Sequence, residues 1–67
     1  MRLTPAAFVI KQFHGIRPLA RAVKRAPSTI FRWQTVGYIP TKAQQDILRA
    51  AKRRRIDIKP QDLIVGR

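Results

Sequence analysis

The chain has 67 residues, which is enough for one small domain and for a core with few residues to spare. Hydrophobic residues make up 45% of it, so its composition is not that of a disordered chain. Fifteen lysine and arginine residues against three acidic ones give a formal net charge of +12. Such a charge indicates an anionic partner, with nucleic acid the first candidate, an acidic protein the second and a membrane surface the third.

Several chemistries are excluded or disfavoured by residue content. No cysteine is present, which excludes disulfides and thiolate metal sites. His14 is the single histidine, and the three carboxylates are scattered, so we expect no metal, no cofactor and no enzyme activity. The N-terminal segment has only a short apolar run, which predicts neither a signal peptide nor a membrane span. We therefore expect a cytoplasmic, nucleoid-associated protein of prokaryotic or phage type, with no membrane partner.

The first predicted helix covers about residues 5–14. Thr4 can cap its first turn, Pro5 fits the first helical position, and Gly15 ends it. Phe8 lies off the apolar stripe, and we expect it to cover a satellite pocket or to form a dimer contact. The stripe itself consists of Ala6, Val9, Ile10 and Phe13.

Two further short helices are expected in the middle of the chain. The second covers about residues 16–24, with Leu19 and Val23 on its apolar face. Because proline opens a helix more readily than it continues one, the chain must turn before Pro27. A third helix then covers about 27–36, with Ile30 and Trp33 facing inward.

The C-terminal third predicts one long and one very short helix. Thr41 and Gln44 form a capping-box pattern that opens a fourth helix over about 41–54. The segment 56–58 is expected to be extended, and it would form a strand only if the protein dimerises. A last helical turn is expected at about 60–64, carrying Leu63 and Ile64, with Asp62 near its positive end.

Together these elements predict an all-α fold, a compact four- to five-helix bundle, as one domain over residues 1–67. The second and third helices, separated by about three residues, have the spacing of a helix-turn-helix. In that arrangement one side of the later helix is held by the core, and its other side enters the major groove of DNA.

The stretch LARAVKRAPSTIFRW, Leu19 to Trp33, resembles the Cro and lambda-repressor-like helix-turn-helix domains of phage and bacterial regulators. The matching elements are the Leu-Ala pair, the Pro-Ser-Thr-Ile helix start, the Arg-Trp pair and the later Gly37 with Ile39-Pro40. The resemblance covers roughly residues 4–51. It implies a five-helix domain that binds operator DNA, commonly as a dimer, and regulates transcription.

The chain departs from this family at three positions. Lys24 stands where a glycine is usual in the turn, which costs about 1 kcal/mol if the left-handed backbone geometry is kept. Arg25 replaces an aliphatic core residue. Ile16 replaces a glutamine that contacts phosphate, and we assign that contact to Arg17 instead.

Five residues of the third helix are candidates for contacting bases. Arg32 could bind guanine O6 and N7 together, and its alternatives are a phosphate contact or a solvated side chain. The hydroxyl residues could bind bases or satisfy free N–H groups of the first turn. Phe31 would meet a thymine methyl group or another protein, unless it packs under the C-terminal segment. The full set is Pro27, Ser28, Thr29, Phe31 and Arg32.

Cations on both sides of this motif are candidates for contacting phosphates. The basic run at residues 52–55 has two other interpretations, as a basic tail that acts independently of a dimer or as a solvated helix end favoured by the helix dipole. The full set of candidate phosphate contacts, which adds the neutral Gln34 to these cations, is Arg17, Arg21, Lys24, Arg25, Gln34, Lys42, Lys52, Arg53, Arg54 and Arg55.

The sequence thus predicts a sequence-specific regulator that binds double-stranded DNA, with the helix at 27–36 in the major groove. An alternative is an accessory protein that acts through a protein partner: an antitoxin, a co-activator of RNA polymerase or a recombination directionality factor. Both hypotheses allow a homodimer. An RNA-associated basic protein is disfavoured, because the chain has no aromatic-rich sheet signature and no GXXG loop.

Overall fold

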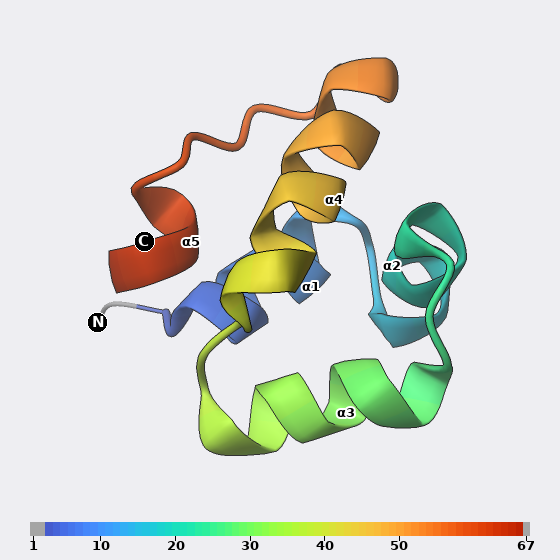
Figure 1. The fold of residues 1–67 in the computed structure, drawn as a ribbon, viewed down its shortest axis with the longest axis vertical. Coiled ribbons are helices and arrows are strands. Elements are labelled where there is room, and N and C mark those ends of the chain that lie inside the picture. Colours follow the sequence, from blue (N-terminus) through green and yellow to red (C-terminus); the bar gives the residue numbers. More distant parts are fainter. Residues whose placement is uncertain (1–2, 67) are drawn as a thin grey trace.

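The computed structural model describes residues 3–66 and confirms the all-α class. Within that range no residue is in a strand. Figure 1 shows α3 lying across one end of the molecule, while α4 rises away from it toward the other end. The helix α5 folds back against α1. The elements are α1 (Pro5–Gln12), α2 (Ile16–Val23), α3 (Pro27–Val36), α4 (Thr41–Arg53) and α5 (Asp62–Val65).

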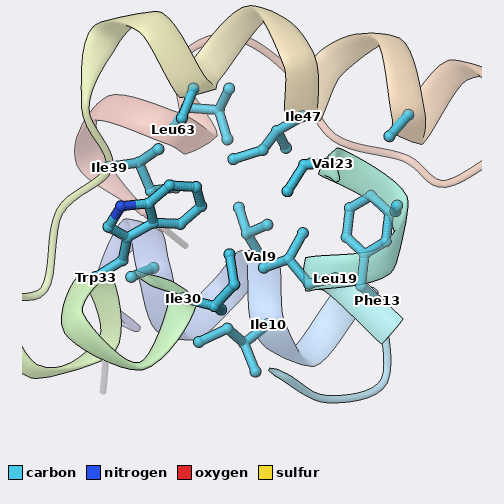
Figure 2. Close-up of a cluster of buried hydrophobic side chains, with 14 of the residues drawn as sticks. Val9, Ile10, Phe13, Leu19, Val23, Ile30, Trp33, Ile39, Ile47 and Leu63 are labelled. Atoms are coloured by element: carbon cyan, nitrogen blue, oxygen red, sulfur yellow. The ribbon is translucent and has the colours of Figure 1, made fainter. Parts of the chain in front are cut away.

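All five helices supply the core. The largest fully buried side chains come one from each helix: Val9, Leu19, Ile30, Ile47 and Leu63. Figure 2 shows them converging, with the Trp33 ring closing one side of the same cluster. Because burying one such side chain stabilises a fold by about 1.5–3 kcal/mol, this cluster is the main reason that so short a chain folds.

Phe8 belongs to this core, so the prediction that it covers a satellite pocket or forms a dimer contact is wrong. Its side chain is 3% exposed. The reason is that α1 is covered by α2, α3 and α5 rather than on a single side. An apolar residue off the main stripe of α1 therefore finds partners as well.

The start of α1 is as predicted, and its end comes two residues early. Thr4 Oγ1 accepts a hydrogen bond from Ala7 N at 3.2 Å, and Pro5 occupies the first turn. The helix ends at Gln12 because His14 takes a left-handed conformation with φ +68°. Gly15 N then donates to Ile10 O at 2.9 Å, which closes the end of the helix.

The capping box expected at α4 does not form. Pro40 is the residue that precedes the first helical position, with ψ 144°, and no side chain caps the helix there. Thr41 is already helical, so its hydroxyl is one position too late to act as the cap. Gln44 Nε2 instead donates to Ile39 O at 3.2 Å.

Residues 56–58 belong to no helix or strand, but they are not fully extended as predicted, because Ile58 N donates to Ile56 O at 3.1 Å and makes a tight turn at Asp57. The chain then turns into α5. This helix begins at Asp62 rather than at Pro60 and runs to Val65 rather than to residue 64. The Asp62 carboxylate accepts a hydrogen bond from Lys59 N at 2.9 Å, which orders the preceding turn. Leu63 is 1% exposed, whereas Ile64 is 68% exposed, so only one of the two residues reaches the core.

The connection between α2 and α3 keeps a left-handed residue without glycine. Lys24 has φ +59° and ψ +45° and ends α2. Its neighbour Arg25 donates from its backbone N to Ala20 O at 3.0 Å, which is the bond that such a helix end requires. The chain thus accepts the steric cost of a Cβ at this position.

Replacing this lysine by glycine should therefore stabilise the fold. We expect Lys24→Gly to raise the free energy of unfolding by about 1 kcal/mol, because glycine adopts the left-handed conformation without strain. Urea unfolding followed by circular dichroism measures it. Lys24→Ala is the control that removes the charge and keeps the strain. An equal gain from both variants would show that charge repulsion, not backbone strain, is relieved.

Candidate nucleic-acid interface

The two sides of α3 differ sharply. Ile30 is fully buried and Trp33 is 5% exposed, and both face the core (Figure 2). On the other side, Ser28 and Arg32 are exposed, and Phe31 is 59% exposed. The predicted division of this helix into an inner and an outer face is confirmed. Packing of the phenylalanine under the C-terminal segment is therefore ruled out.

The remaining candidates on α3 also lie at its surface. Pro27 and Gln34 are exposed, and Thr29 is half-buried at the edge of the helix. The Thr35 hydroxyl donates to Phe31 O at 3.0 Å, so it satisfies the helix rather than an external group. Ser28 and Arg32, four positions apart, are thus left available on the outer side of α3, whereas Gln34 is exposed on a different side, about 200° from Arg32 around the helix axis.

A pocket of about 370 Å³ joins α3 to the start of α4. Thr29, Arg32 and Val36 line it from α3, and Lys42 lines it from the first turn of α4. Arg25 also lines it, so the structure brings two predicted phosphate-binding cations, Arg25 and Lys42, beside two predicted base-contacting residues. We call this pocket and the exposed side of α3 the α3 surface.

Tyr38 is a further member of the α3 surface that sequence reasoning missed. It lines the same pocket and is 63% exposed. A tyrosine next to a predicted DNA-reading helix was the available signal, since its hydroxyl can donate to a phosphate.

Arg25 is held inside the protein's own structure. Its Nη2 lies 2.8 Å from Asp46 Oδ2, and the guanidinium carbon is 5.8 Å from the centre of the Trp33 ring. The Arg25 Nε atom is buried and has no hydrogen-bond partner among the described residues. Arg25 therefore links the turn before α3 to α4 through an ion pair. The aliphatic residue that the family resemblance implies at this position would make the same link by packing.

The basic run at residues 52–55, which covers the last turn of α4 and the two residues after it, lies away from the α3 surface. Figure 1 shows the last turn of α4 at the end of the molecule opposite to α3, along the longest dimension, which is 27 Å. The major groove is only about 8.5 Å deep, so a duplex at α3 does not extend to that end. The structure thus separates four predicted phosphate-binding residues from the α3 surface: Lys52, Arg53, Arg54 and Arg55.

The other predicted phosphate-binding residues are on or next to α2. Arg17 and Arg21 are exposed on α2, in its first and last turns. Lys24 is exposed in the turn and faces a second pocket, between α2 and α4, together with Arg49. Arg49 was not among the predicted site residues, because a single arginine within an amphipathic helix carries no signal of its own.

Comparison with known proteins yields no relative for this chain: no family model, no curated protein and no solved structure matches it. Residues 3–66 contain no helix that is long and apolar enough to span a bilayer. The same residues hold no group of three metal-ligating side chains.

The Arg25–Asp46 pair should make a small and measurable contribution to stability. Both side chains are about one-third exposed, so solvent screens the pair and we expect a coupling energy of about 0.5–1 kcal/mol. A double-mutant cycle with Arg25→Met and Asp46→Asn isolates it, because methionine retains contact with the Trp33 ring. Urea titrations give the free energy of unfolding of the wild type, the two single variants and the double variant. A coupling energy of zero would mean that packing alone holds the turn.

Proposed function

We propose that this protein is a sequence-specific transcriptional regulator that binds double-stranded DNA, with α2 and α3 as its helix-turn-helix. One observation carries the proposal: α3 is anchored by Ile30 and Trp33 while Ser28, Phe31 and Arg32 stay uncovered. The net charge of +12 supplies the attraction to a polyanion. The resemblance to Cro and lambda-repressor-like domains supports the same function.

The dimensions of α3 suit the major groove. A helix with its side chains is about 10–12 Å across, and the groove is about 12 Å wide. Within the groove, Arg32 would bind guanine through two hydrogen bonds, and Phe31 would contact a thymine methyl group. Ser28 and Thr29, in the first turn of α3, would bind a base edge or the adjacent phosphate.

Phosphate contacts would flank the groove from two other elements. Lys42, in the first turn of α4, shares a pocket with Arg32. Arg17, next to Ile16 in the first turn of α2, would make the phosphate contact that the family resemblance implies for a glutamine at position 16. A duplex would therefore be held at the starts of α2 and α4 and read by the helix between them.

Selection of bound duplexes from a random library tests the proposal directly. We expect a short consensus sequence, because base contacts from α3 discriminate among sites. A palindromic consensus would also show that two copies bind with two-fold symmetry. Recovery of unselected sequences at the same affinity would contradict sequence-specific binding.

Three single variants separate the proposed roles. Arg32→Ala should weaken the selected site by roughly 5- to 150-fold, corresponding to about 1–3 kcal/mol, and should weaken random duplex far less. Lys42→Ala should weaken both duplexes alike and reduce the slope of log K against log[salt] by about 0.9. Arg54→Ala is the matched control from the far end of α4, and its salt slope should stay within error of the wild type. Fluorescence anisotropy at several salt concentrations measures all three.

The Arg54→Ala control also tests whether the duplex lies at α3. If Arg54→Ala reduced the salt slope as much as Lys42→Ala, the duplex would have to lie along α4 rather than at α3. Equal losses from Arg32→Ala on the selected and random duplexes would make that arginine a phosphate contact.

A further inference from the structure

A second and larger pocket, of about 640 Å³, lies between the end of α2 and the second half of α4. Ala22 and Val23 contribute apolar surface to it, and each is 7% exposed. Its other lining residues are charged: Asp46, and the four cations Lys24, Arg49, Lys52 and Arg53. We call it the α2–α4 pocket.

The charge of this pocket is strongly positive and locally uncompensated. All four cations are exposed, and none of them has a carboxylate partner among the ion pairs of residues 3–66. The one carboxylate in the lining, Asp46, is already paired with Arg25 at 2.8 Å. An anionic group entering the pocket would therefore meet cations whose charge the protein itself does not neutralise.

The proposed DNA interface does not use this pocket. Two of its four cations, Lys52 and Arg53, are in the last turn of α4, which lies at the opposite end from α3 in Figure 1. A duplex seated on α3 thus leaves the pocket open. The four cations remain to be explained, in a chain whose self-repulsion already costs stability.

We propose that the α2–α4 pocket docks an acidic segment of a partner protein. The segment would place one apolar side chain over Ala22, Val23 and the methylene stems of the surrounding cations, and its carboxylates against the charged ends of those cations. Two features favour a peptide over a second duplex. A pocket of this volume accommodates a few side chains. A phosphate backbone, unlike a peptide, offers no apolar group to cover the methylene stems of the lysine and arginine side chains that surround the nearly buried Ala22 and Val23.

The proposal is independent of DNA binding at α3, and it is tested on the full chain with a defined probe. The probe is a fluorescein-labelled ten-residue peptide of aspartate and glutamate with one central leucine, and binding is measured by anisotropy. A second peptide carries serine in place of leucine. We expect wild-type protein to bind the leucine peptide several-fold more tightly than the serine peptide, because only leucine buries apolar surface in the pocket.

A pair of double variants with equal charge locates the binding site. Arg49→Gln with Arg53→Gln should weaken the leucine peptide by about tenfold, since two exposed ion pairs are lost. Lys11→Gln with Lys59→Gln removes the same charge from exposed positions outside the pocket, and it should change the affinity less than twofold. Thermal unfolding of both double variants checks that the fold is retained.

Three results would overturn the proposal. The first is no binding of the leucine peptide by the wild type. The second is an equal loss in both double variants, which would show attraction to the overall charge only. The third is displacement of the peptide by a random 20-base-pair duplex, together with a loss of duplex affinity in the Arg49→Gln, Arg53→Gln double variant that equals its loss of peptide affinity. That result would assign the pocket to nucleic acid. Continued peptide binding at saturating duplex, weakened at most about fivefold, supports it.

Discussion

Burial of one side of α3 is the constraint on which the rest of this structure depends. Ile30 and Trp33 are enclosed by a core to which all five helices contribute. Neighbouring residues on a helix point about 100° apart, so fixing these two side chains also fixes where the residues between them point. Phe31 and Arg32 are exposed for that reason alone. If α3 were rotated about its axis so that its outer residues faced inward, Trp33 would leave the core. The orientation seen in the structure is therefore the stable one.

Most of the fold could be predicted from local sequence signals. The predictions that failed concern residues whose positions depend on contacts between distant segments. Proline and glycine mark both ends of α3, and its bounds were predicted correctly. Phe8 could not be placed, because its burial depends on neighbouring helices, including α5, more than fifty positions along the chain. Thr41 was misplaced by a single residue, because Pro40 takes the extended conformation of a cap without having a capping side chain.

For the candidate site, local sequence signals predict still less of what the structure shows. Helical period was enough to predict which α3 residues face outward. The grouping of cations was not predictable, since fifteen lysine and arginine residues differ only in which of them the tertiary path makes neighbours. That path places Lys42 in the same pocket as Arg32, and Arg49 in the same pocket as Lys24. It places the basic run at 52–55 at the end of the molecule opposite to α3. The same path pairs Arg25 with Asp46 across 21 positions, which no local pattern indicates.

That ion pair also connects the two basic surfaces. Arg25 lines the pocket of the α3 surface, and Asp46 lines the α2–α4 pocket. An anion that drew the guanidinium away from Asp46 would leave a free carboxylate facing the second pocket, where it would repel an acidic segment. The two proposed ligands should therefore weaken one another slightly, and by the same factor in both directions, because linkage between binding sites is reciprocal. The contribution of this pair to the coupling is bounded by the strength of one solvent-screened pair, about 1 kcal/mol.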